Sequence, residues 1–188
     1  MVKVKVKIGE IASFAALLVT LASLLASVCW ISSSKAGGEA DDMKTAALGF
    51  MILRLESATQ ASTSLVQAQS YLTQAGMYFA EAESADDSEL MSYMNDLGNQ
   101  SLEISDYYAS LADTAEQRSQ SYYDNYSLAL SSAQEQGNIA DYRSTGALLF
   151  TVSAIVGSSA GLFKRKEILY VYVSIFVVAL SFLMMSIL

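Results

Sequence analysis

Three apolar segments without an acidic or basic residue interrupt this chain, and they constrain its fold more than any other feature. They lie at residues 11–31, 147–163 and 168–188. A helix of about 20 apolar residues crosses the hydrocarbon core of a bilayer. Only 16% of all residues are charged, whereas soluble domains average about a quarter. The sequence therefore predicts an all-α protein with three transmembrane helices and a polar insert.

The first apolar segment has two possible roles. Lys3, Lys5 and Lys7 precede it and could form the basic start of a cleavable signal peptide. The segment is longer than the apolar core of roughly 7–15 residues that is usual in signal peptides. Trp30, near its end, is typical of a membrane-interface anchor. These features favour a retained signal-anchor helix over a cleaved signal.

Basic residues separate the second and third apolar segments. Lys164, Arg165 and Lys166 lie between them, and each would cost on the order of 2.5–3.5 kcal/mol at the centre of a membrane helix. A continuous helix through this region is therefore disfavoured. We expect two spans joined by a tight turn.

The distribution of charge predicts the orientation. Residues 35–143 hold five basic and seventeen acidic residues, a net charge of −12. Cytoplasmic loops attract Lys and Arg, and three spans place both basic clusters on the same side. We expect a multi-pass protein of the cell membrane, with the N-terminus cytoplasmic and the C-terminus extracytoplasmic. The predicted order is a cytoplasmic tail (1–10), a first span (11–33), an acidic helical extracytoplasmic domain (34–143), a second span (144–163), a cytoplasmic turn (164–167) and a third span (168–188).

The acidic domain has the pattern of two helices. Gly37 and Gly38 suggest a loose exit from the first span, and Gly137 with Asn138 suggests a helix end before the second span. Turn-forming residues at positions 84–89 separate the two arms. The sequence therefore predicts a long antiparallel helical hairpin of the coiled-coil type.

The second arm contains a heptad-like repeat that predicts its contact seam. The hairpin could fold into a compact bundle, or hairpins from several chains could pack together. The predicted seam consists of Leu90, Met94, Leu97, Ile104, Tyr108, Leu111, Ala115 and Tyr122.

The residues that usually perform catalysis are scarce. The chain has no histidine and one cysteine, which excludes a Ser–His or Cys–His pair. Asp86, Asp87 and Glu89 could bind a divalent cation, but they lack the spacing of a calcium loop, and a helix cap is the favoured interpretation. We expect no catalytic residue, no cofactor and no metal site.

Two further motifs are candidates for contact or modification. Ser153, Gly157 and Gly161 have the spacing of small residues that lets membrane helices approach closely, either within the chain or between chains. Asn99 and Asn125 each begin a glycosylation pattern. Nine of the eleven tyrosines lie in the acidic domain, where they could fill its core or recognise a partner.

The end of the chain resembles that of uncharacterised prokaryotic membrane-protein families with one N-terminal span, a long helical insert and a C-terminal two-span hairpin. The resemblance covers residues 142–188 and implies no activity. It is carried by Gly146-Ala147-Leu148-Leu149-Phe150, by Phe163-Lys164-Arg165-Lys166 and by Ile168-Leu169-Tyr170-Val171-Tyr172.

These features together favour a non-enzymatic interaction protein, a structural or accessory subunit of a membrane assembly. Its expected partners are membrane lipid and either a second copy or another membrane protein, and not nucleic acid. The alternative is a ligand- or ion-sensing extracytoplasmic domain that signals through a partner subunit.

Overall fold

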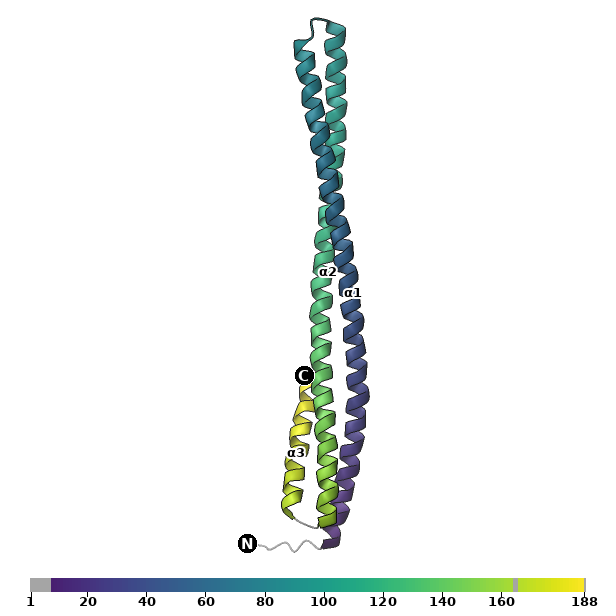
Figure 1. Cartoon of the computed structure of the whole chain (residues 1–188), viewed down its shortest axis with the longest axis vertical. Helices are drawn as coiled ribbons and strands as arrows, with labels where there is room; N and C mark the ends of the chain where they lie inside the picture. The colour runs from purple at the N-terminus through teal and green to yellow at the C-terminus, as the bar shows by residue number, and fades with distance from the viewer. Residues whose placement is uncertain (1–7, 164–165, 188) are drawn as a thin grey trace. The chain divides into compact units, whose positions relative to one another are not determined.

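The computed structural model consists of helices throughout the residues that it describes (Figure 1). These are residues 8–163 and 166–187, with the side chains of residue 13 and of residues 15–159 and 167–187. The helices are α1 (Ile8–Ser84), α2 (Ser88–Phe163) and α3 (Lys166–Met185). The predicted all-α fold is confirmed. The predicted topology determinants Lys3, Lys5, Lys7, Lys164, Arg165 and Lys166 have side chains outside the described residues.

The helix breaks predicted at glycine were wrong. Gly37 and Gly38 lie within α1, and Gly137 lies within α2. A glycine costs only about 1 kcal/mol in a helix interior relative to alanine, and packing along a long helix outweighs that cost. The chain also lacks proline, the residue that would break these helices.

A short turn joins α1 to α2 at the predicted position. The Asp87 side chain accepts a hydrogen bond from the Glu89 backbone N–H at 2.9 Å, and its carbonyl accepts one from the Met91 N–H at 2.9 Å. Asp87 is therefore the N-cap of α2, because it satisfies backbone donors that have no partner within the helix.

The chain divides into two compact units. We name Thr45–Ala129 the two-helix unit, and Met1–Lys44 together with Leu130–Leu188 the three-helix unit. In the two-helix unit, α1 and α2 run antiparallel and meet along a line of mostly small residues, which we name the inner seam. Its residues alternate in steps of three and four, apart from a step of seven between Phe50 and Ser57. On α1 it comprises Ala47, Phe50, Ser57, Ala61, Ser64, Ala68, Tyr71, Ala75, Tyr78 and Ala82; on α2 it comprises Met94, Gly98, Ser101, Ser105, Tyr108, Ala112, Ala115, Ser119, Tyr122 and Tyr126.

Small side chains in the inner seam bring the two backbones close together. The Ser105 hydroxyl on α2 donates to the Ala68 carbonyl on α1 at 2.9 Å, and the Ser119 hydroxyl donates to the Arg54 carbonyl at 3.4 Å. A serine side chain is short, so it reaches a carbonyl of the opposite helix only where the helices nearly touch. Larger seam residues would hold the axes further apart.

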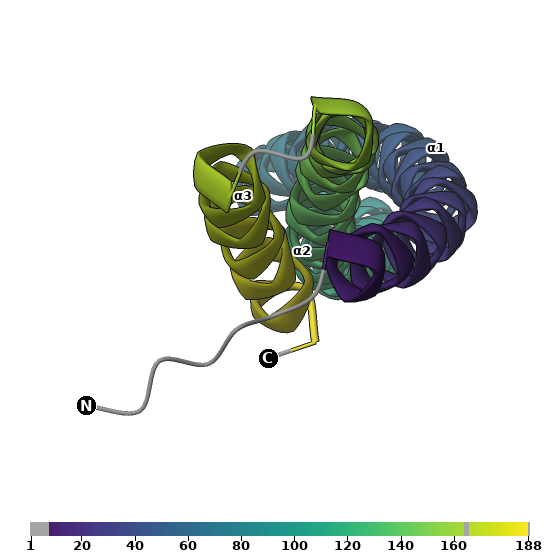
Figure 2. The same ribbon diagram turned by 90° about the horizontal axis from the view of Figure 1, so that it is seen from below.

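In the three-helix unit, α3 packs against both α1 and α2, and Figure 2 shows the three helices from one end. Phe150 of α2 is fully buried and meets the Phe176 ring of α3 edge-on, with 5.3 Å between the ring centroids. The Ser33 hydroxyl of α1 donates to the Ala140 carbonyl of α2 at 2.9 Å. The core residues are Ala26 and Cys29 of α1, Ala147 and Phe150 of α2, and Ala179 of α3.

Two helices in the described part of the chain contain a stretch long and apolar enough to cross a membrane. One stretch lies in α1 within Ala15–Ser84, with a mean hydropathy of 2.1, and the other is Glu167–Met185 of α3, with 2.5. These stretches are 22% and 11% buried, whereas the core helix of a soluble protein is mostly buried. The third predicted span, at the end of α2, does not pass this test, and the side chains of residues 160–163 lie outside the description.

Candidate functional site

An exposed apolar stripe runs along α1 in the two-helix unit, turned away from the inner seam. Leu48, Met51, Leu55, Leu65 and Leu72 lie on one line of alternating three- and four-residue steps, which Ala58, Ser62 and Gln69 complete. Ile52 and Val66 lie beside this line, so all seven residues share one side of the helix. Each is at least half exposed, Met51 least at 52% and Leu55 most at 70%. We name this surface the outer stripe; it consists of Leu48, Met51, Ile52, Leu55, Leu65, Val66 and Leu72.

Ile52 and Leu55 lie between two shallow grooves. One groove, of about 850 Å³, continues from these residues to Tyr108 and Leu111 of α2. The other, of about 480 Å³, continues from the same two residues to Ser119 of α2. The two side chains therefore form a ridge flanked by hollows on both sides, which is a shape that a second helix can pack against.

The outer stripe lies on the less charged of the two helices. Residues 48–80 of α1 contain one basic and one acidic residue, Arg54 and Glu56, whereas residues 88–129 of α2 contain seven acidic residues and one basic residue, Arg118. Contact surfaces between proteins are depleted of charge at their centre. The helix that exposes the apolar residues is thus also the one that can be buried at the lower electrostatic cost.

The structure divides the predicted seam of α2 into two lines. Met94, Tyr108, Ala115 and Tyr122 lie in the inner seam. Leu90, Leu97, Ile104 and Leu111 form a flank beside it, with Leu90 45% and Ile104 39% exposed. Seam positions near the leucines are instead held by small residues such as Gly98 and Ser105. A β-carbon on Gly98 would lie 2.5 Å from the Phe79 ring, so that position accepts no larger residue without movement.

Aromatic side chains fill parts of the inner seam that the small residues leave open. The rings of Tyr71 and Tyr108 stack across it, with 5.7 Å between centroids and an interplanar angle of 7°. The Arg54 guanidinium lies 4.5 Å from the centroid of the Tyr123 ring, a cation–π contact between α1 and α2. Tyr93 and Tyr107, by contrast, are 58% and 59% exposed.

The predicted small-residue face of the second apolar segment lies inside the three-helix unit. Ser153 is fully buried. A β-carbon on Gly157 would lie 2.7 Å from the Tyr172 ring of α3 and 2.8 Å from the Val19 side chain of α1. Gly157 is therefore a point of close approach of three helices within one chain. The surroundings of Gly161 lie outside the described residues.

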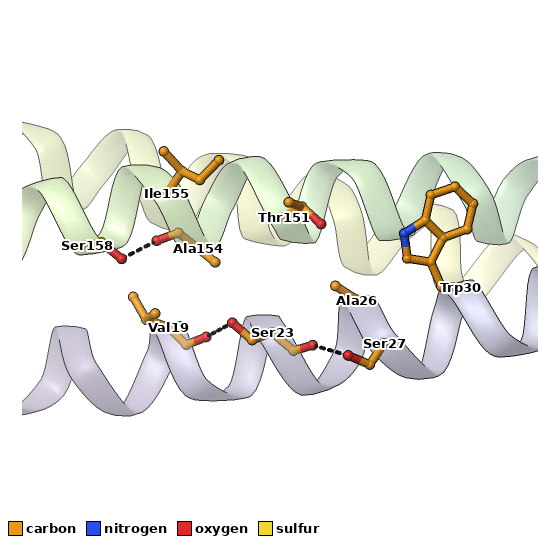
Figure 3. Close-up of a pocket in the computed structure, with 9 residues that line it drawn as sticks. All are labelled: Val19, Ser23, Ala26, Ser27, Trp30, Thr151, Ala154, Ile155 and Ser158. Atoms are coloured by element: carbon orange, nitrogen blue, oxygen red, sulfur yellow. Dashed lines mark hydrogen bonds between the residues drawn. The ribbon is translucent and has the colours of Figure 1, made fainter.

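A third groove, of about 380 Å³, lies in the three-helix unit between the apolar parts of α1 and α2 (Figure 3). Trp30 closes one end, and serine and threonine side chains lie along it. Their hydroxyls donate to carbonyls of their own helices, as Ser23 does to Val19 at 2.9 Å and Ser158 does to Ala154 at 2.8 Å. Because these donors are satisfied, the groove presents a surface suited to an apolar neighbour.

The other predicted site residues lie on exposed helix surfaces. Asn99 and Asn125 are both exposed on α2. Asp87 of the acidic cluster caps α2. Within the described ranges, no three carboxylate or thiol groups come together to hold a metal ion.

The heptad pattern predicted Met94, Tyr108, Ala115 and Tyr122 of the inner seam, but it predicted neither the small seam residues nor the outer stripe. The signal that could have found the rest of the seam is the recurrence of Ala, Ser and Gly at steps of three, four and seven residues, from Ser57 to Ala82 and from Gly98 to Ser119. Comparisons with protein-family models, with curated proteins and with solved structures find no match for this chain.

Proposed function

We propose that this chain is a non-enzymatic integral membrane protein that acts as a structural or accessory subunit of a membrane assembly. The observation that carries the proposal is the outer stripe. Its large apolar residues are more than half exposed, while small residues occupy the seam within the chain. Exposed apolar patches of this kind mark interaction sites. The absence of histidine and the exposed, dispersed carboxylates support a role in contact rather than catalysis.

The proposal includes three spans, at residues 11–33, 144–163 and 168–188, with residues 34–143 outside the cytoplasm. The apolar stretches in α1 and α3 support two of these spans. The third follows from the uncharged apolar sequence of residues 147–163 and its packing beside α3. The basic clusters at both predicted cytoplasmic positions support the orientation.

The test is purification of the tagged full-length chain from native membranes, followed by mass spectrometry and measurement of the mass of the complex. The monomer has a mass of 20.2 kDa. We expect a larger protein mass, made either of several copies or of this chain with another membrane protein. A strictly monomeric sample that carries no other membrane protein would contradict the proposed function.

A further inference from the structure

We propose that the outer stripe of α1 pairs with the same stripe of a second copy, parallel and in register. The inference rests on the proposed function, because it identifies the partner of that interaction surface. It concerns the two-helix unit and the residues from Leu48 to Leu72.

The charge of the two helices selects α1 as the contact helix and a second copy as its partner. Over residues 88–129, α2 carries seven acidic residues against one basic residue, so contact between the α2 helices of two copies would bring like charges together. Residues 48–80 of α1 contain one basic and one acidic residue, Arg54 and Glu56, and so have no net charge to attract a strongly charged partner. The stripe fits a helix with an apolar face and no net charge, and a second copy supplies that surface.

The spacing of the outer stripe makes it self-complementary. In a parallel two-fold pair, each residue meets its own equivalent in the partner, so Leu48 meets Leu48 and Val66 meets Val66. Leu48, Met51, Leu55, Leu65 and Leu72 lie on a line of alternating three- and four-residue steps, with Ala58, Ser62 and Gln69 at its other positions, as in a helical contact line that follows a supercoil. Two copies anchored in one membrane by the same spans point the same way, which selects the parallel pairing over the antiparallel one.

The ridge formed by Ile52 and Leu55 makes the two paired surfaces complementary in shape as well as apolar. Grooves of about 850 and 480 Å³ flank the ridge. In a two-fold pair, the ridge of each copy can settle beside that of the other, into one of these grooves. The pairing buries side chains that the isolated chain leaves more than half exposed, including Leu55 at 70%.

The first experiment is disulfide cross-linking of the full-length chain in native membranes. Cys29 is replaced by serine, and single cysteines are placed at Ile52, Leu55 or Val66, with Leu128→Cys as the control. Leu128 is as exposed as the stripe residues, at 67%, but lies on α2. We expect covalent dimers at the stripe positions, at least several-fold more than at Leu128. Equal yields at all positions, or no dimer at the stripe, would overturn the inference.

The second experiment measures the mass of the complex for Leu55→Glu and for the matched variant Leu128→Glu, with circular dichroism as a check on helix content. Both variants replace a leucine that is about two-thirds exposed, so both keep the fold of the single chain. We expect Leu55→Glu to reduce the mass to that of one copy, while Leu128→Glu leaves it unchanged. Equal masses for the two variants would overturn the inference.

These experiments separate failure of the inference from failure of the proposed function. If Leu55→Glu releases a different membrane protein and no stripe cysteine forms a dimer, self-pairing is overturned and the proposed function is supported. If there is neither a dimer nor any co-purifying protein, both are overturned.

Discussion

Gly157 lies where three helices pack so closely that a β-carbon at this position would overlap its neighbours. Its Cα faces the Tyr172 ring on one side and the Val19 side chain on the other, both nearer than a β-carbon would allow. The Tyr172 ring is 1% exposed, so the packing around it leaves little room for it to move away. Gly137, in the same helix, has no atom of another residue within 4 Å of the corresponding position.

We expect Gly157→Ala to lower the free energy of unfolding of the three-helix unit by about 1–3 kcal/mol, the usual cost of overpacking. Gly137→Ala is the matched control. It should be neutral or stabilising by up to about 1 kcal/mol, because alanine favours the helix. Equilibrium unfolding of both variants in the same detergent measures the difference. A Gly157→Ala protein as stable as the control would contradict the close contact.

The roles of some single residues could be predicted from the sequence, and the roles of others could not. Asp87 was recognisable as a cap, because its side chain acts on backbone groups only two residues away. The role of Ser105 was not recognisable, because its hydroxyl meets Ala68, 37 residues earlier in the chain. Serine and alanine occur on exposed and buried faces alike, so their identity alone does not reveal a seam.

At the scale of the helix, the two sides of α1 are distinguished by side-chain size. The inner seam holds mainly small residues, and the outer stripe holds leucine, isoleucine, valine and methionine. Of the predicted seam, Leu90, Leu97, Ile104 and Leu111 lie beside the inner seam, because small residues that let the two backbones approach occupy much of the contact between α1 and α2. The sequence predicted the two helices and their turn, but it did not predict which face of each helix meets the other.

The same substitution, alanine to leucine, at Ala112 and at Ala80 tests whether the inner seam is tightly packed. Ala112 is 6% exposed in the inner seam, whereas Ala80 is exposed on α1. We expect Ala112→Leu to force the helices apart and to cost about 1–3 kcal/mol, and Ala80→Leu to change stability by less than about 0.5 kcal/mol. Amide hydrogen exchange, read by mass spectrometry, should quicken around Ala112 in the first variant alone. Unchanged exchange in that variant would argue against a tight seam.

At the scale of the whole molecule, the apolar stretches could be predicted from the sequence. The helix boundaries of the structure, however, do not show how many times the chain crosses a membrane. The α1 and α2 helices pass from apolar into polar sequence without a break, because glycine alone does not stop a well-packed helix. Membrane boundaries are set by side-chain hydropathy and charge, and those change within a helix without changing its backbone.

Labelling from one side of the membrane tests the proposed topology. In a Cys29→Ser background, Asp113→Cys in the acidic domain should react with a membrane-impermeant maleimide added to intact cells. Lys166→Cys, in the predicted cytoplasmic turn, should react only after the membrane is opened. The reversed pattern, or equal labelling of both positions in intact cells, would contradict the proposed orientation.

The thiol of Cys29 can report when the helices of the three-helix unit separate. It is 1% exposed and lies in the core formed by Ala26, Ala147, Phe150 and Ala179. A buried thiol is shielded from reagents, so a membrane-permeant maleimide can modify it only when the three helices part. The rate of that modification measures the frequency of local opening. Because the chain has no other cysteine, this measurement can be made on the unmodified protein in its own membrane.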